Sequence, residues 1–535
     1  MGNCCETERE STPKPEPPSS TATKPSTLNI PFSNHVSADA PSPALPRRSN
    51  KGQSPVLAQF SGQATALPTS TAQAETGFQK ATVGRRMLKL RTVFSVHFEV
   101  VRELHRDQFC VVRLMEQKLT HRQAVIKKVD TRGNESAGAI VNQELAVDSR
   151  LDHPNVLKTV EVYYDGRAIY MISEMLLSDP VLDFASIRHL SQSTALKIGY
   201  QVLTTLKYCH PKLIPHLNIS TETLLVQTGS TNGESLIKLA GFGSRPSQDP
   251  ASALFKAPEL LRGLPGSDKA DIWACGVLLF YLLCKEMPFH DTDEVLSGKP
   301  KFKQVYWEKK GVNARILIST MLDLEASARP SASQCMSHSL FHSPAFEVPA
   351  EPSFLCPSLD GLRTAVPMDE LTRAVVSYVS SFVRDSGYIK SMMADFKALD
   401  TDEDGEISLS ELIEGYVKTG LDREEAAIVG KSVLQTVGTA QSGVITYSEF
   451  LFAHADLATL LSRENLRHVY AALHASAGTQ PRLKDLQVHI RGQREENTRK
   501  RWQELWEKHG FHKDKRLACE DFVELLQNGN IAALE

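Results

Sequence analysis

The sequence IKLAGFGSRP, residues 237–246, is typical of a strand that ends in a turn, here made by Gly241-Phe242-Gly243. This segment lies inside a longer region in which two kinds of pattern follow one another. Between about residues 98 and 341, short β-branched runs come first and longer helical patterns come later. That order predicts a small sheet-rich lobe followed by a larger helical lobe.

Composition sets limits on the class of protein. The chain has 535 residues, which is enough for two or three domains, and its formal net charge of -3 gives no reason to expect a nucleic-acid partner. Nine cysteines are scattered without metal-like spacing or a disulfide framework. This usage favours a reducing, intracellular compartment.

The N-terminal sequence MGNCCETERE carries a possible lipidation signal. Gly2 is in the acceptor position for N-myristoylation, and Cys4 and Cys5 could be palmitoylated, although Glu6 stands where Ser or Thr is preferred. Two acyl chains would anchor the chain stably, whereas one would not. We therefore predict that the protein attaches to the cytoplasmic face of the plasma membrane or of an internal membrane, and that it is cytoplasmic if it is not acylated. The alternative is that the N-terminal segment is an ordinary disordered terminus without lipid.

The predicted fold class is α+β, with a bilobal domain, a separate all-α domain and a disordered N-terminal tail. The tail is rich in Pro, Ser, Thr and Ala and cannot bury enough apolar surface to fold. A stretch over 344–366 contains several Pro and Gly and is typical of a connector. The predicted boundaries are 1–92 for the tail, 93–343 for the bilobal domain, 344–384 for a junction and 385–530 for the all-α domain.

Several motifs of the bilobal region resemble those of eukaryotic Ser/Thr protein kinases. AVIKKV matches the strand that carries the phosphate-contacting lysine, NQELAVDSRLDHPN matches the following helix, and KAPELL and DIWACGVLLFYLL match scaffold segments of the large lobe. The resemblance implies that Lys127, with Lys128 as a one-residue alternative, pairs with Glu144 to bind nucleotide. It also implies that Arg329 pairs with Glu259. A lysine–glutamate pair can equally serve only to lock the two lobes together.

The residues that such kinases use for chemistry are replaced. In VVRELHRDQFCVVRL the three glycines of the phosphate-covering loop become His105, Asp107 and Cys110. In IPHLNISTETLLV, Asn218 replaces the catalytic aspartate and Thr223 replaces the metal-binding asparagine. In the segment IKLAGFGSRP, Gly241 stands at the position where these kinases carry the magnesium-binding aspartate. The sequence therefore predicts that the family's fold is kept and its active site is lost.

The segment DTDEDGEISLSE, residues 400–411, matches the EF-hand calcium loop without departure. Gly405 makes the sharp turn of such loops, and Ile407 would form a small strand paired with a sister loop. The predicted calcium ligands are Asp400, Asp402, Asp404, Glu406 through its carbonyl, Ser408 directly or through water, and Glu411.

Three further units have the same pattern in eroded form. The sister loop GTAQSGVITYSE, residues 438–449, lacks the first two carboxylates, and HASAGTQPRLKD and GFHKDKRLACED are less complete still. We expect these units to fold as EF-hands without an ion. A kinase-like domain, a helical junction and four EF-hand-like units together resemble the calcium-dependent protein kinases of plants and protists.

This resemblance implies that the junction, about residues 367–384, lies against the kinase-like lobe until calcium releases it; an ordinary entry helix of the EF-hand domain is the alternative. Three functions are open. The first is a membrane-tethered, calcium-binding pseudokinase that acts as a scaffold or allosteric regulator through protein partners on the kinase-like lobe or the EF-hand domain. The second is a calcium-dependent kinase with weak or atypical ATP-dependent activity through Lys127. The third is ATP binding without turnover. The replaced catalytic residues favour the first.

Overall fold

The computed structural model describes the chain in segments, and the following concerns these residues alone. They are 88–89, 98–106, 110–118, 122–132, 137–175, 190–228, 235–243, 250–307, 310–342, 352–365, 376, 386–438, 443–454, 460–477, 480 and 516–531.

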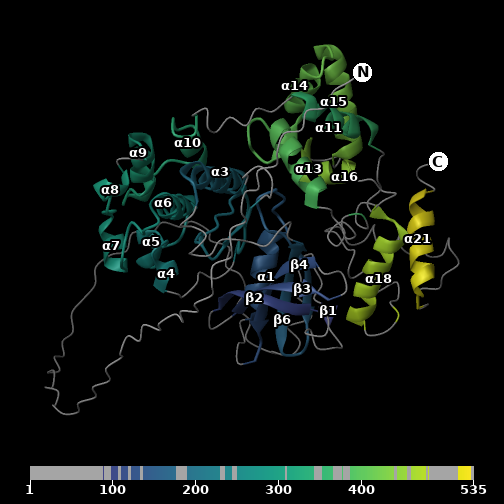
Figure 1. Cartoon of the computed structure of the whole chain (residues 1–535), viewed down its shortest axis with the longest axis horizontal. Coiled ribbons are helices and arrows are strands. Elements are labelled where there is room, and N and C mark those ends of the chain that lie inside the picture. Colours follow the sequence, from purple (N-terminus) through teal and green to yellow (C-terminus); the bar gives the residue numbers. More distant parts are fainter. Residues whose placement is uncertain are drawn as a thin grey trace, which may run out of the picture. The chain divides into compact units, whose positions relative to one another are not determined.

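A six-stranded sheet forms the small lobe (Figure 1), with strand order β1-β5-β6-β4-β3-β2. Strands β2 to β6 pair antiparallel, and the two-residue β1 pairs parallel with β5. Helix α1, Ala137–Asp148, packs on the sheet through Val141 and Leu145, which share a core with Ile169. The strands are β1 Leu88–Lys89, β2 Phe98–Arg106, β3 Cys110–Gln117, β4 Arg122–Asp130, β5 Thr159–Tyr164 and β6 Ala168–Met175.

The large lobe is mainly helical and is built around α6, Asp268–Cys284. Every residue of α6 from Ala270 to Cys284 is buried, as expected for a helix with apolar side chains on all its faces. The predicted two-lobed architecture is thus confirmed. The remaining elements of this lobe are α3 Gln192–Cys209, η3 His210–Lys212, β7 Leu224–Thr228, β8 Ser235–Leu239, α4 Pro250–Ala253, α5 Pro258–Leu261, α7 Thr292–Ser297, α8 Gln304–Trp307, α9 Val312–Met321, η4 Ala326–Ala328 and α10 Ala332–Met336.

Two helix–loop–helix units follow, and their loops pair through two short strands. Strands β9 and β10 are antiparallel, with Ile407 opposite Ile445, so the predicted pairing of Ile407 with a sister loop is confirmed. Phe396 and Phe450 are fully buried in the core that the units share. The elements are α13 Ser386–Leu399, β9 Glu406–Ser408 and α14 Leu409–Lys418, then α15 Arg423–Val437, β10 Val444–Thr446 and α16 Tyr447–Ala453.

The expectation of a connector over 344–366 is wrong for its second half. Residues Pro352–Thr364 form helix α11, even though Pro357 lies inside it and cannot donate a helical hydrogen bond. Leu359 and Leu362 are spaced three apart and are both buried in the core of the helix–loop–helix units. Burial of these two side chains offsets the cost of the proline, and local composition does not reveal that burial.

Several predictions fall outside the described residues. They include the lipidation residues Gly2, Cys4 and Cys5, most of the junction 367–384, and most of the two last EF-like loops. Two helices in this region, α18 Arg463–Ala477 and α21 Cys519–Ile531, lie side by side (Figure 1) and are joined by an ion pair in which Arg467 Nη2 lies 2.7 Å from Glu520 Oε1. Among the described helices, none is both long and apolar enough to cross a membrane.

Candidate functional site

The predicted lysine–glutamate pair is present in the small lobe. Lys127 lies in β4, which is hydrogen-bonded to β3 on one side and β6 on the other, and Glu144 lies in α1. The Lys127 Nζ to Glu144 Oε2 distance is 2.6 Å, and the two side chains are only 17% and 10% exposed. A partly buried charge pair of this kind fixes α1 against the sheet. Its role in nucleotide binding stays a prediction.

A buried histidine organises the catalytic-loop segment between η3 and β7. His216 Nδ1 accepts the Asn218 N–H at 3.2 Å, and His216 Nε2 donates to the Ala240 carbonyl at 3.0 Å. Burial lowers the pKa of His216 to about 4, so this ring is neutral at physiological pH. The Asp271 carboxylate accepts the backbone N–H groups of His216 and Leu217, both at 2.7 Å. These bonds fix the conformation of the loop.

Thr223, at the position of a metal-binding asparagine, has its hydroxyl group committed to the loop itself. Its Oγ1 donates to the Asn218 carbonyl at 2.9 Å and accepts the Ser220 N–H at 3.1 Å. Magnesium requires oxygen ligands in near-octahedral geometry, commonly carboxylates. Gly241 has no side-chain oxygen, and the Thr223 hydroxyl is already hydrogen-bonded within the loop, so these two positions lack the carboxylate and amide ligands of the kinase motif.

Strand β2 also contacts the turn that precedes β7, the segment in which the sequence predicts a catalytic loop. His105 Nδ1 lies 3.3 Å from Glu222 Oε2, and the same carboxylate oxygen accepts the Ser252 hydroxyl at 2.9 Å. The sequence predicts that His105 stands at the position of the first glycine, where the kinase motif requires a residue without a side chain. This contact between the lobes was missed at the sequence level, because Glu222 is distant in the chain and carries no local signal.

The scaffold ion pair of the large lobe is present as predicted. Arg329 Nη1 and Nη2 bond the two Glu259 oxygens at 2.7 and 2.9 Å, and the arginine also donates to the Lys269 carbonyl at 2.9 Å. Its guanidinium carbon lies 4.9 Å from the centre of the Trp273 ring. The predicted scaffold contact of the large lobe is therefore present.

The loop 400–411 has the geometry of a preformed cation site. Carboxylate oxygens of Asp400, Asp402 and Glu411 lie within 4.8 Å of one another. Gly405 has a φ of +81°, the left-handed conformation that the sharp turn requires. The donors are the hard oxygen ligands that calcium prefers, so the loop fits this ion.

Hydrogen bonds hold the carboxylates of this loop in place. Asp400 Oδ2 accepts the Gly405 N–H at 3.0 Å, while Glu411 Oε1 accepts the Thr401 N–H at 2.7 Å and Glu411 Oε2 accepts the Ser408 N–H at 2.8 Å. Burial raises the pKa of Asp400 to about 7, with the neighbouring carboxylates acting in the same direction and the Gly405 N–H opposing them. A cation would relieve the repulsion that these charges exert on one another.

Comparison with known proteins agrees with the two-lobed geometry. Residues 98–341 match the family model of the protein kinase domain. The chain is 26% identical to calcium-dependent protein kinase 4 of Plasmodium berghei (strain Anka) over 406 residues, which cover 71% of this chain and 76% of that protein. It is 25% identical to calcium-dependent protein kinase 34 of Arabidopsis thaliana over 513 residues, 91% and 94% of the two chains. For calcium-dependent protein kinase 17 of the same plant, identity is 24% over 556 residues, 99% and 97% of the two chains. The chain is thus a kinase-like protein related to calcium-dependent protein kinases.

Proposed function

We propose that this protein is a calcium-binding pseudokinase that acts as a scaffold or allosteric regulator in signalling. The observation that carries the proposal is that the Thr223 hydroxyl group is hydrogen-bonded within its own loop, to the Asn218 carbonyl and the Ser220 N–H. Asn218 cannot act as the general base, since an amide does not accept a proton from a substrate hydroxyl group. Gly241 removes the other metal ligand, and phosphoryl transfer depends on metal ions to neutralise the developing charge.

The calcium part of the proposal rests on residues 400–411 and on the kinship with calcium-dependent kinases. We propose that the two helix–loop–helix units joined by β9 and β10 are an EF-hand pair in which the first loop binds calcium. In the second loop, Gly438 and Ala440 stand at the positions of the first two carboxylate ligands. That unit contributes its strand and its share of the core to the pair.

Attachment to the cytoplasmic face of a membrane belongs to the same proposal. Its support is the sequence of Gly2, Cys4 and Cys5, which offers two kinds of acylation on one segment. Protein partners would then meet the kinase-like lobe or the EF-hand pair close to that membrane.

A residual kinase activity is the second candidate, and one observation favours it. The Lys127–Glu144 pair is short and mostly buried, as a nucleotide-positioning pair would be.

We expect that restoring two catalytic carboxylates does not restore catalysis. In Asn218→Asp/Gly241→Asp, Thr223 still lacks the metal-binding amide and His105 still contacts Glu222. Position 241 also has a φ of +86°, which is less favourable for aspartate than for glycine. The measurement is phosphate transfer from labelled ATP with magnesium, by the double variant and by the same variant carrying Lys127→Ala. Transfer that disappears with Lys127→Ala would contradict the proposal.

A further inference from the structure

Strand β2 carries a histidine in the same row of the sheet as Lys127. The strands β4, β3 and β2 follow one another to one edge of the sheet (Figure 1). His105 of β2 is directly opposite Val112 of β3, and Val112 is directly opposite Lys127 of β4. Directly opposite side chains point to the same face of a sheet, and neighbouring strands lie about 4.8 Å apart. His105 and Lys127 therefore share one face, two strand spacings from each other.

His105 contacts the large lobe from this face. Its Nδ1 lies 3.3 Å from Glu222 Oε2, and the two side chains are only 14% and 23% exposed. The Ser252 hydroxyl group of α4 is buried and donates to the same Glu222 oxygen at 2.9 Å. The Glu222 N–H in turn donates to Ser220 Oγ at 3.2 Å, which fixes the turn that precedes β7. We call His105, Glu222 and Ser252 the clasp.

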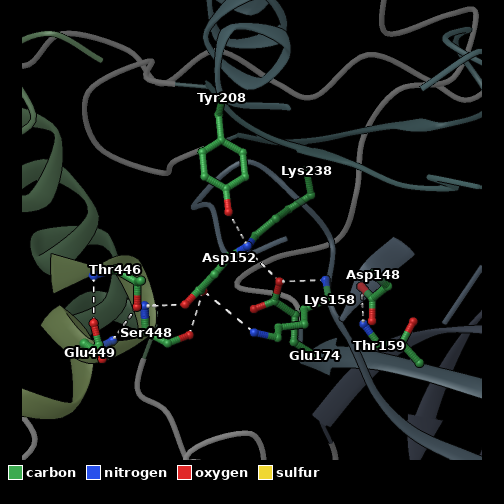
Figure 2. A network of polar contacts seen from close by, with 10 residues as sticks. All are labelled: Asp148, Asp152, Lys158, Thr159, Glu174, Tyr208, Lys238, Thr446, Ser448 and Glu449. Carbon is green, nitrogen blue, oxygen red and sulfur yellow. Dashed lines mark hydrogen bonds and ion pairs between the residues drawn. The ribbon is translucent and has the colours of Figure 1, made fainter. Parts of the chain in front are cut away.

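A second connection between the lobes lies at β6. Figure 2 shows Lys238 of β8 directed toward Glu174 of β6, with Lys238 Nζ 2.7 Å from Glu174 Oε1. The same oxygen accepts the Lys158 N–H at 3.3 Å. Strands β4 and β3 separate β6 from β2, so the two connections lie three strand spacings, about 14 Å, apart. Two contacts at this separation hinder rotation of one lobe against the other.

The clasp lies where a nucleotide needs room for its phosphates. At the position predicted for His105 the kinase motif has glycine, because the backbone must approach the phosphates closely. Lys127, the predicted phosphate-contacting residue, is on the same face of the sheet as the His105 ring. The Glu222 carboxylate brings a negative charge to this region, and that charge repels phosphate. A nucleotide and the closed clasp therefore compete for one space.

We propose that the clasp is an internal gate of the nucleotide site, and that ATP reaches Lys127 only when His105 and Glu222 are separated. The inference rests on the proposed pseudokinase function, because it concerns the same altered site. Closed molecules do not bind ATP, so the apparent ATP affinity of the protein falls in proportion to the fraction of molecules that are open. Opening admits ATP without supplying the missing metal ligands, so binding is not followed by phosphate transfer.

The test measures the ATP affinity of the full-length protein by isothermal titration calorimetry in EDTA, so that no divalent cation takes part. His105→Gly is expected to bind ATP about tenfold or more tightly than the parent, since a hydrogen bond to a charged group stabilises the closed state by at least an equivalent amount. Glu222→Ala opens the clasp from the other lobe and should also bind ATP more tightly. The gain should be absent in His105→Gly/Lys127→Ala.

Val101→Gly is the matched control, because it places glycine in the same strand at a side chain that is 44% exposed. Its ATP affinity should equal that of the parent. Loss of the Glu222 charge would by itself favour ATP, so the double variant His105→Gly/Glu222→Ala separates charge from contact. If the two residues act through one contact, its gain is smaller than the product of the two single gains, whereas independent effects multiply.

Hydrogen exchange tests the clasp without a ligand. The amide hydrogens of β2 should exchange faster in Glu222→Ala, although this substitution lies in the other lobe. Unchanged exchange in β2, equal ATP affinity of His105→Gly and the parent, or gains that multiply in the double variant would overturn the clasp. Phosphate transfer from labelled ATP by His105→Gly in magnesium, lost on adding Lys127→Ala, would instead overturn the proposed pseudokinase function and leave the clasp supported.

Discussion

Asp400→Asn is expected to weaken calcium binding by about 100-fold or more. Even the loss of a hydrogen-bonding partner outside the ligand sphere typically reduces metal affinity about 10–100-fold, and Asp400 would be a direct ligand. Asparagine keeps the shape of the side chain and an oxygen that can accept the Gly405 N–H, so the loss is mainly one of charge.

The measurement is a calcium titration of the full-length variant, followed by thermal unfolding with and without calcium. Without calcium the variant should unfold at the parent's temperature or above it, because a buried carboxylate beside other carboxylates has been neutralised. Calcium should then raise the unfolding temperature of the parent only. Asp422→Asn, which alters a carboxylate that caps α15, is the control and should leave calcium affinity unchanged. Equal calcium stabilisation of Asp400→Asn and the parent would contradict a calcium site in residues 400–411.

Arg329→Met is expected to destabilise the kinase-like domain by about 3–5 kcal/mol, the usual cost of removing one partner of a buried ion pair. The Arg329 side chain has no exposed surface, and Glu259 would be left in a largely buried position without its partner. Burial alone would raise the pKa of Glu259, but the bonds from Arg329 hold that pKa below its usual value. The stabilisation is therefore present above the ordinary carboxylate pKa and is lost as the pH falls through the lowered one.

Denaturant unfolding near pH 7 measures this effect, and two variants sharpen it. Arg329→Met/Glu259→Leu should be more stable than Arg329→Met alone, because no unpaired charge remains buried. Arg423→Met removes an arginine from an exposed pair with Glu414 and should leave unfolding unchanged. A loss of stability in Arg329→Met no larger than in Arg423→Met would show that the ion pair does not support the large lobe.

The sequence predicted those features whose residues lie in motifs with fixed spacing. The Lys127–Glu144 and Arg329–Glu259 pairs were placed correctly because each residue belongs to a recognisable segment of the kinase pattern. Helix α11 was missed because its stability comes from the burial of Leu359 and Leu362 in a distant core, which overrides the prolines and glycines of the segment.

Contacts between remote parts of the chain could not be predicted in the same way. Asp152 and Ser448 are 296 positions apart, and nothing periodic in either segment links them. His105 and Glu222 each lie in a segment whose motif is altered, so the family pattern gives no expectation for their contact. Such contacts result from tertiary packing and become visible only in the three-dimensional structure.

The central claim is that the kinase-like domain does not transfer phosphate, and its most direct test is incorporation of labelled phosphate from ATP. The assay compares the full-length protein with Lys127→Ala in magnesium and in manganese, each with and without calcium. We predict no incorporation above that of Lys127→Ala under any of the four conditions. Incorporation that is abolished by Lys127→Ala would mean that a rearranged site catalyses the reaction and would contradict the assignment as a pseudokinase.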